Sequence, residues 1–241
     1  MVYNADSTGM EGSVMPTVLI TGANRGLGFE FARQYCADGW RVIATCRKPE
    51  AADRLETLGC NAEVHPLDVA DFAQVEALAH ALDHEKIDLL INNAGVYGPK
   101  SSPLGALDFT AWEEVFRVNS MAPLKICECF ADHVAGGKLK LMVTITSRMG
   151  SIDDNSSGGD YFYRASKAAV NAVMKSLSID LKERGITVAV LHPGWVRTDM
   201  GGERAPIDAG QSITGMRKVI AGLKPSDSGK FLDFNGDEIP W

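Results

Sequence analysis

The sequence predicts an α/β protein with one Rossmann-type domain, in which a doubly wound parallel sheet of about seven strands has helices on both faces. Three observations lead to this prediction. Short apolar runs alternate with longer segments of helical apolar spacing along the chain. A glycine-rich turn joins the first strand to the first helix, and small or polar residues follow the later strands. No linker or repeat divides residues 15–241, so we expect a single dinucleotide-binding domain after a loose polar arm at 1–14.

The first strand and helix enclose the strongest local signal. The apolar run at residues 17–20 leads directly into the sequence Thr21-Gly22-Ala23-Asn24-Arg25-Gly26-Leu27-Gly28. Helical spacing then continues to Asp38, which is the order that a dinucleotide-binding loop requires. Gly22 can make the sharp turn, Gly26 keeps side chains away from a pyrophosphate, and Gly28 lets the helix approach the sheet. The helix N-terminus then offers N–H groups to the phosphates.

The second strand, at residues 40–45, is followed by two cations, Arg47 and Lys48. An NAD site usually has a carboxylate here for the ribose 2′-hydroxyl, and a carboxylate would repel a 2′-phosphate. Arg47 would pair with that phosphate, and Arg25 in the glycine loop can add a second contact. We therefore expect NADP(H) rather than NAD, although both arginines would also fit as solvated loop charges.

The third and fourth strands also end in candidate cofactor contacts. Residues 62–67 are followed by Asp68 and Val69, and Asp68 can cap the next helix or accept a hydrogen bond from an adenine amino group. These two interpretations are compatible. Residues 87–91 end at Asn92-Asn93-Ala94-Gly95, where small residues and amides let a cofactor lie close to the sheet.

A helix expected over residues 110–130 contains Asn119, for which spacing alone leaves two interpretations open. Asn119 can bond its own surroundings, or it can bulge the helix and hold a water that serves Lys167. The fifth strand at 141–145 is followed by Ser147, and a polar loop occupies 153–159.

Tyr163 and Lys167 stand one turn apart at the head of a helix that runs to about residue 184. Side chains at this spacing start about 5–6 Å apart. A fixed ammonium near a phenol favours the phenolate, which makes Tyr163 a better acid and base near neutral pH, and Ser147 can add a hydroxyl. The sixth strand at 186–191 and a last short strand at 230–234 complete the sheet. Tyr97, Met149, Ile152 and Trp195 can line an apolar pocket or pack as ordinary core, and residues 200–211 can form a lid.

Composition excludes several classes of function. A net charge of −7 and a pI near 5.3 argue against a nucleic-acid surface. The start of the chain lacks the pattern of a signal peptide, and no apolar run approaches the roughly 20 residues of a spanning helix, so we expect a cytoplasmic protein without a membrane span. The five cysteines are odd in number and lack a Cys-x-x-Cys spacing, so we expect reduced thiols and no metal site.

Five motifs resemble those of the classical short-chain dehydrogenase/reductase family, in the family's order: Thr21-Gly22-x-x-x-Gly26-x-Gly28, Asn92-Asn93-Ala94-Gly95, Ser147, Tyr163-x-x-x-Lys167 and Pro193-Gly194. The resemblance covers nearly the whole chain. The likeness is greater to sniffer-type carbonyl reductases and C-factor proteins, through Gly150-Ser151-Ile152, residues 156–159, 163–167 and 191–202, and the stretch 205–216. The added loop at 153–159 departs from the general family pattern but fits this subgroup.

The resemblance implies an NADPH-dependent reductase of a ketone, aldehyde or quinone. Tyr163 would donate a proton to the carbonyl oxygen, Ser147 would bond that oxygen, and Lys167 would lower the Tyr163 pKa and bond the nicotinamide ribose. Asn119 would support a proton-relay water. The resemblance implies cofactor contacts from Gly22, Asn24, Arg25, Gly26, Leu27, Gly28, Arg47, Asp68, Val69, Asn93, Ala94, Gly95, Tyr163, Lys167, Pro193, Gly194, Val196 and Thr198. It also implies a homodimer or homotetramer, and the C-factor likeness leaves an NADP-binding signalling or regulatory protein as the alternative.

Overall fold

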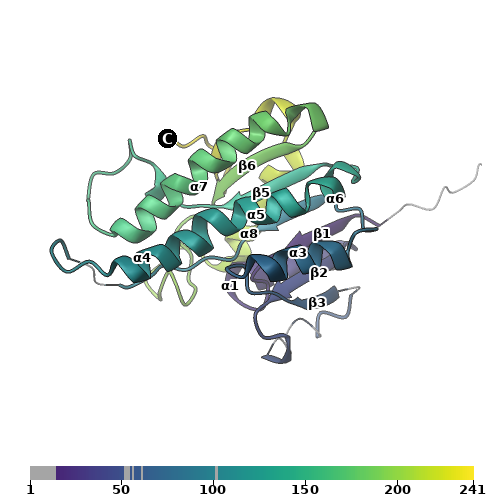
Figure 1. Ribbon diagram of the computed structural model, residues 1–241, viewed down its shortest axis with the longest axis horizontal. Coiled ribbons are helices and arrows are strands. Elements are labelled where there is room, and N and C mark those ends of the chain that lie inside the picture. The colour runs from purple at the N-terminus through teal and green to yellow at the C-terminus, as the bar shows by residue number, and fades with distance from the viewer. Residues whose placement is uncertain (1–14, 52–54, 56, 61, 101–102) are drawn as a thin grey trace, which may run out of the picture.

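The computed structural model describes residues 15–51, 55, 57–60, 62–100 and 103–241, so the expected arm at 1–14 lies outside the described residues. Seven strands form one sheet in the order β3-β2-β1-β4-β5-β6-β7 (Figure 1). Every pairing is parallel, which confirms the predicted fold class. The strands are β1 (Thr17–Ile20), β2 (Arg41–Cys46), β3 (Ala62–Pro66), β4 (Leu89–Asn92), β5 (Leu141–Ile145), β6 (Thr187–His192) and β7 (Phe231–Asp233).

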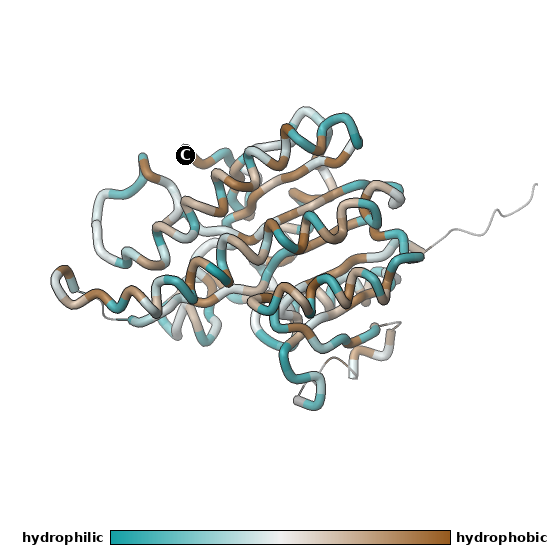
Figure 2. The backbone as a smooth tube through the Cα atoms, in the orientation of Figure 1, coloured by the Kyte–Doolittle hydropathy of each residue, from teal (hydrophilic) through white to brown (hydrophobic). Residues whose placement is uncertain are grey.

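Helices cover both faces of the sheet, because each strand is apolar on both sides and must be shielded twice. On one face lie α1 (Gly26–Ala37) and α8 (Ala209–Gly222), which pack with Val18, Ile20 and Val42. The other face carries α3 (Phe72–Ala81), α4 (Phe109–Phe116), α5 (Ala122–Cys129), α6 (Ala131–Ala135) and α7 (Tyr161–Asp180). Leu19, Ile43 and Leu90 point into this second layer, and Figure 2 shows apolar residues concentrated along the strands.

Strand order decides where a ligand can bind. The chain leaves β1 for β2 on one side and later returns to place β4 on the other side of β1. Loops that leave the carboxyl ends of β1 and β4 therefore diverge, and this switch point is the usual ligand crevice of such a sheet. The glycine-rich loop after β1 and the Asn-Asn-Ala-Gly segment at the end of β4 both lie there, as the sequence predicts.

Two helix boundaries differ from expectation. Asp71 caps α3, since its carboxylate accepts from the backbone N–H groups of Ala73 and Gln74. The interpretation of Asp68 as that cap is therefore wrong: its carboxylate accepts from the Ala70 N–H in the turn before the helix. Helix α7 begins at Tyr161, two residues before the expected start. Short 3₁₀ turns occupy Pro49–Ala51, Arg148–Gly150, Lys182–Arg184 and Pro225–Asp227.

The expectation of reduced cysteines is wrong for one pair. Cys36 in the last turn of α1 is joined by a disulfide to Cys60, just before β3. Their Cα atoms lie 5.7 Å apart although 24 positions separate them in sequence, a proximity that spacing alone does not reveal. Cys46, Cys127 and Cys129 are free thiols. Within the described ranges, no cluster of His, Cys, Asp or Glu suits a metal ion, and no helix has the length and apolarity to cross a membrane.

Candidate active site

Glycines shape the loop that leaves β1. Gly22 and Gly26 have φ angles of 64° and 54°, a left-handed conformation that side chains with a Cβ disfavour. A Cβ at Gly28 would lie 2.2 Å from the Gly22 carbonyl oxygen, so only glycine lets α1 pack against this loop. The residue before the helix, Arg25, makes no side-chain capping bond, so no side chain of the cap residue competes for the first-turn N–H groups. The loop therefore fits a phosphate at the helix N-terminus.

The amide of Asn93 holds the glycine loop in place. Its Nδ2 donates to the carbonyl oxygens of Thr21 and Gly22 at 2.9 and 3.1 Å. In return, the Thr21 hydroxyl oxygen accepts from the backbone N–H groups of Asn93 and Ala94 at 3.0 and 3.1 Å. These four bonds tie the carboxyl ends of β1 and β4 together. Asn93 thus shapes the predicted cofactor site through its contacts with the loop. Thr21, for which the sequence suggested no role of its own, belongs to the same set of hydrogen bonds.

The two predicted phosphate-binding cations lie at the surface. Arg47 is exposed at the end of β2. Arg25 forms an ion pair with Asp199, whose carboxylate lies 2.7 Å from the guanidinium. This pair joins the glycine loop to the segment after β6, and the Cβ position of Gly26 lies 3.8 Å from the Thr198 methyl group. Asp199 is a charged neighbour of the site that sequence reasoning did not single out.

The remaining predicted cofactor contacts differ in how open they are. Val69 is buried in the core, whereas Asn24, Leu27, Ala94 and Gly95 are half-buried around the loop. After β6, Gly194 has a φ of 82°, and a Cβ there would lie 2.6 Å from Ile207. The Pro193 carbonyl accepts from Ser212 of α8 at 2.6 Å, and the buried Val196 forms a bridge with Ile207. The Thr198 hydroxyl oxygen accepts from the Gly201 N–H at 3.2 Å.

Asn119 lies in a π-helical turn, Arg117–Met121, that interrupts the helix expected over 110–130. Its Oδ1 accepts from the Val96 N–H at 2.9 Å, and its Nδ2 donates to the Val96 carbonyl at 2.8 Å and to the Ser166 hydroxyl at 3.0 Å. Asn119 therefore bonds its own surroundings, as the first interpretation has it, and it also lies in a helix bulge, as the second has it. The water that would serve Lys167 stays a prediction. A Cβ at Gly95 would lie 3.3 Å from Asn119 Oδ1 and 3.7 Å from Lys167 Nζ, so these two polar atoms flank the same backbone atom.

Ser147, Tyr163 and Lys167 come together at the carboxyl end of β5. All three are buried, and the Ser147 hydroxyl oxygen accepts from the Met149 N–H at 3.1 Å. Lys167 Nζ donates to the carbonyl oxygen of Ile145 at 2.9 Å and lies 5.7 Å from the centroid of the Tyr163 ring. A side-chain hydrogen bond links Tyr163 with Ser147 and favours the charged phenolate.

Burial dominates the electrostatics of this trio. It raises the pKa of Tyr163 to about 12, and the hydrogen bond with Ser147 only partly offsets the effect. Burial also lowers the pKa of Lys167 to about 8. The net shift of the Tyr163 pKa is thus opposite to the expected one, because desolvation of the phenolate exceeds the hydrogen-bond contribution. Tyr163 therefore keeps its proton at neutral pH.

The expected apolar pocket is divided into two parts. Trp195 is exposed, donates to the Gly201 carbonyl at 2.8 Å, and lines a cavity of about 530 Å³ with residues 201–204. Tyr97 instead stacks on Tyr163, with ring centroids 4.6 Å apart. Ile152 is exposed on the loop after Ser147, and its backbone N–H donates to the carbonyl of Trp241.

This fold and site define a class of protein. The model of the short chain dehydrogenase family matches residues 16–208, and the chain belongs to this family of oxidoreductases. Among its relatives, the C-signal protein of Myxococcus xanthus is 44% identical over 155 residues, which are 64% of this chain and 93% of that protein.

Two solved structures share the complete architecture. Carbonyl reductase Sniffer of D. melanogaster superposes with a TM-score of 0.88 at 30% identity and covers 95% of this chain and 100% of its own. NADPH-bound carbonyl reductase from chicken fatty liver has a TM-score of 0.87 at 34% identity and covers 94% of this chain and 99% of its own. These matches confirm the family and the subgroup likeness that the sequence predicts.

Proposed function

We propose that this chain is an NADPH-dependent carbonyl reductase that reduces a ketone, aldehyde or quinone. One observation carries the proposal: a buried phenol, Tyr163, is hydrogen-bonded to Ser147 with Lys167 beside it, at the sheet edge that also holds the glycine loop. NADPH, when bound, supplies the hydride, and the first turn of α1 with the loop of Gly22 to Gly28 would hold its pyrophosphate. The sheet edge thus combines a cofactor cradle with a proton donor.

The roles of the polar side chains follow from their chemistry. Ser147 would donate a hydrogen bond to the substrate oxygen, and Tyr163 would transfer its proton to that oxygen as negative charge develops there. The raised pKa of Tyr163 keeps this proton in place at neutral pH. Lys167, with a pKa of about 8, is mostly protonated there and places positive charge beside the phenolate that forms. Asn119 would support the return of a proton towards Lys167, since both flank Gly95.

The preference for NADPH rests on Arg25 and Arg47. Both are exposed, Arg25 in the glycine loop and Arg47 just after β2. Neither β2 nor the residues just after it supply a carboxylate before Glu50. Arginine pairs with a phosphate through two parallel N–H bonds, which a ribose hydroxyl cannot match. The chicken carbonyl reductase, which resembles this chain along its length, was solved with NADPH.

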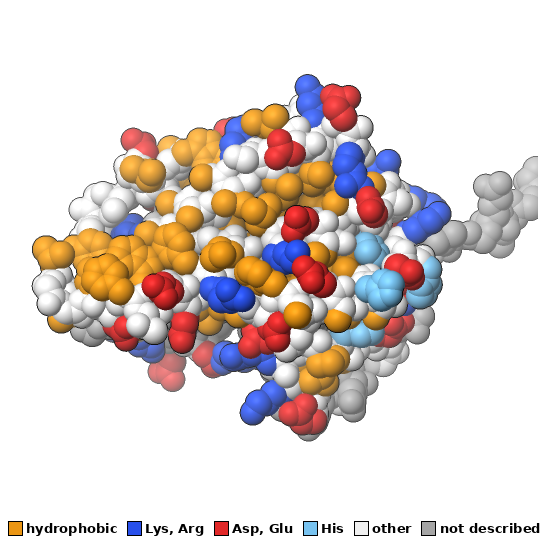
Figure 3. Space-filling view, in the orientation of Figure 1, with side chains coloured by type: hydrophobic (Ala, Val, Ile, Leu, Met, Phe, Trp, Pro, Cys, Tyr) orange, Lys and Arg blue, Asp and Glu red, His pale blue; other side chains and the backbone are white. Residues whose placement is uncertain are grey.

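Self-association is part of the same proposal. Figure 3 shows apolar side chains gathered around α4 at one end of the molecule. Exposed apolar residues here include Leu104 just before α4 and Phe109 in α4, followed along the chain by Met121 in the π-helical turn and Leu124 in α5. Apolar surface of this kind commonly marks a protein contact. We propose that it joins copies of the chain in a homodimer or homotetramer, and light scattering of the purified protein would measure the mass of the assembly.

The first experiment follows the loss of NADPH absorbance with benzaldehyde, acetophenone and menadione, each repeated with NADH. We expect turnover with NADPH at a kcat/KM at least about tenfold above that with NADH, the scale of a lost charged hydrogen bond. Arg47→Ala should narrow this ratio, and Lys48→Ala serves as the matched control because it removes a neighbouring charge. A preference for NADH would contradict the cofactor assignment. Tight NADPH binding without any turnover would favour the regulatory alternative.

A further inference from the structure

Tyr97 occupies a fixed position beside the proposed proton donor. Its ring stacks on Tyr163 with centroids 4.6 Å apart and planes inclined by 23°. The residue before it, Val96, is held by Asn119 through both its N–H and its carbonyl group. The residue after it, Gly98, has a φ of 82°, and a Cβ there would lie 2.7 Å from Val115 of α4. The backbone is therefore fixed on both sides of Tyr97.

The far end of the Tyr97 side chain meets Asp160, the residue before α7. Asp160 has φ 45° and ψ 38°, a left-handed conformation, and it makes no capping bond to the helix. Burial, followed by a hydrogen bond and the charge of Asp160, raises the pKa of Tyr97 to about 12. Few non-glycine residues adopt this conformation, although Asp does so more often than most. The hydrogen bond with Tyr97 gives the Asp160 carboxylate a partner outside the helix.

The space next to this stack is too small for a substrate. The cavity lined by Tyr97, Pro99 and residues 160–163 has a volume of about 20 Å³. A space of this size holds about one water molecule. A cavity of this size does not admit a carbonyl compound between Tyr97 and residues 160–163.

We propose that Tyr97 is a positioning residue for Tyr163, packed on its ring so that the hydroxyl stays directed towards Ser147, and anchored by Asp160 at the start of the catalytic helix. The inference rests on the proposed function, in which Tyr163 donates the proton. A phenol ring turns about two side-chain torsions, and a second ring stacked on its face restricts both. Proton transfer depends on the orientation of the Tyr163 hydroxyl, because a small displacement of a catalytic acid strongly reduces the rate of the chemical step.

Three variants and one control test the role. Tyr97→Leu removes the stack, and we expect kcat to fall about tenfold, with KM and the NADPH dissociation constant within about twofold. Tyr97→Phe keeps the stacked ring but loses the hydroxyl that bonds Asp160, so kcat should fall by no more than about threefold. Asp160→Gly removes the same bond and suits the left-handed backbone, so kcat should fall to a similar small extent while the melting temperature does not fall. Trp40→Leu is the control: it removes the ring contact with Tyr35, whose centroid lies 4.8 Å away at the amino edge of the sheet, and it should leave kcat unchanged.

Two further readouts separate positioning from general loosening. Burial is the main reason for the raised Tyr163 pKa, so hydration of its ring in Tyr97→Leu should move the high-pH limb of kcat/KM to lower pH. NMR with ¹³C-labelled tyrosine should show faster rotation of the Tyr163 ring in Tyr97→Leu than in the wild type, with Tyr163→Phe used to assign the signal.

A rise in KM with unchanged kcat would make Tyr97 a substrate contact and overturn the inference. Unchanged ring rotation in Tyr97→Leu would overturn it as well, and this readout does not depend on turnover. Failure of the proposed function looks different, since the wild-type protein would then bind NADPH without turning over any carbonyl compound, whereas the rotation of the Tyr163 ring could still be measured.

Discussion

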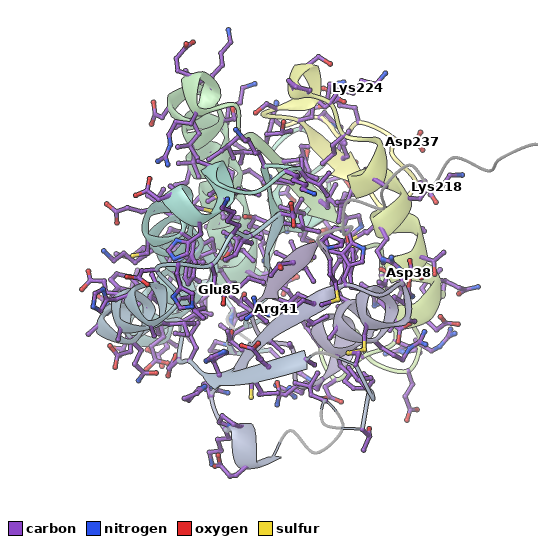
Figure 4. The ribbon with its side chains drawn as sticks, turned by 90° about the vertical axis from the view of Figure 1, so that its right-hand side faces the viewer. Asp38, Arg41, Glu85, Lys218, Lys224 and Asp237 are labelled. Carbon is purple, nitrogen blue, oxygen red and sulfur yellow. A yellow bond between two sulfur atoms is a disulfide. The ribbon has the colours of Figure 1, made fainter. Side chains whose placement is uncertain are left out.

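The two edges of the parallel sheet both bury polar side chains, but they satisfy them differently. At the amino edge, the buried Asp88 accepts from the N–H groups of Thr17, Lys138 and Leu139 at 2.9, 2.7 and 3.4 Å. Arg41 at the start of β2 pairs with Glu63 at 2.8 Å and with Glu85, and Figure 4 shows Arg41 and Glu85 next to one another. Arg41, Glu63 and Glu85 thus each have a partner of opposite sign, and Asp88 has three N–H donors.

At the carboxyl edge the buried charge of Lys167 is poorly compensated. Lys167 is 5% exposed, and the acceptor of its ammonium is a neutral carbonyl, that of Ile145. The pKa values record the difference. Hydrogen bonds with Glu85 raise the pKa of Arg41, and Arg41 lowers that of Glu85, so both charged forms are stabilised. Burial lowers the pKa of Lys167, so its charged form is destabilised. We therefore expect Arg41, Glu85 and Asp88 at the amino edge to stabilise the fold, and Lys167 at the carboxyl edge, a proposed catalytic group, to reduce the free energy of unfolding.

Of the variants considered, Tyr163→Phe should change kcat most, and it tests the role of the carboxyl edge directly. Loss of the proton donor should reduce kcat by about 10²–10⁴-fold, while the stack with Tyr97 and the dissociation constant of NADPH stay nearly unchanged. Stopped-flow absorbance and fluorescence titration measure the two quantities. Retention of more than about a tenth of the wild-type kcat would contradict the role of Tyr163.

Asp88→Ala should give the largest change in stability. It leaves three backbone N–H groups without their carboxylate, so the free energy of unfolding should fall by about 2–3 kcal/mol. The variant should keep the wild-type kcat, because Asp88 lies at the opposite edge of the sheet from Tyr163. Urea unfolding followed by circular dichroism gives the stability. An unchanged urea midpoint together with a reduced kcat would mean that Asp88 at the amino edge serves activity rather than stability.

Lys167→Met should remove activity yet stabilise the protein, opposite in sign to Asp88→Ala. At neutral pH, the ammonium is buried with its pKa lowered from 10.5 to about 8, so its replacement should add roughly 1–3 kcal/mol to the free energy of unfolding. The folded wild type binds fewer protons than the unfolded chain between these two pKa values, so wild-type stability rises with pH there. The advantage of Lys167→Met should therefore shrink between neutral pH and about pH 10, and urea midpoints at both pH values check it. Destabilisation at neutral pH would show that the bond to Ile145 outweighs burial.

Glu63→Gln should have the smallest effect. Glu63 is exposed and shares Arg41 with Glu85, so the loss should stay below about 1 kcal/mol and diminish in high salt. Thermal melts at low and high ionic strength measure it. A loss as large as that of Asp88→Ala would mean that the whole Arg41 cluster acts as one buried unit.

The sequence by itself determined the fold class and the four candidate catalytic residues. Apolar periodicity, the glycine loop and the order of the five motifs depend on near neighbours and on the carboxyl ends of consecutive strands. The expected convergence of Asn119, Ser147, Tyr163 and Lys167 follows from that topology, and the structure brings them together. Their chemical roles remain predictions until Tyr163→Phe is measured.

Tertiary structure decided the features that depend on distant contacts. The disulfide of Cys36 with Cys60, the ion pair of Arg25 with Asp199 across 174 positions, and the stack of Tyr97 on Tyr163 join segments whose local patterns carry no mutual signal. The Tyr163 pKa belongs with them. Spacing shows that an ammonium lies one turn away, but the net shift depends on how much water the surrounding chain excludes, and that is a property of the packed protein alone.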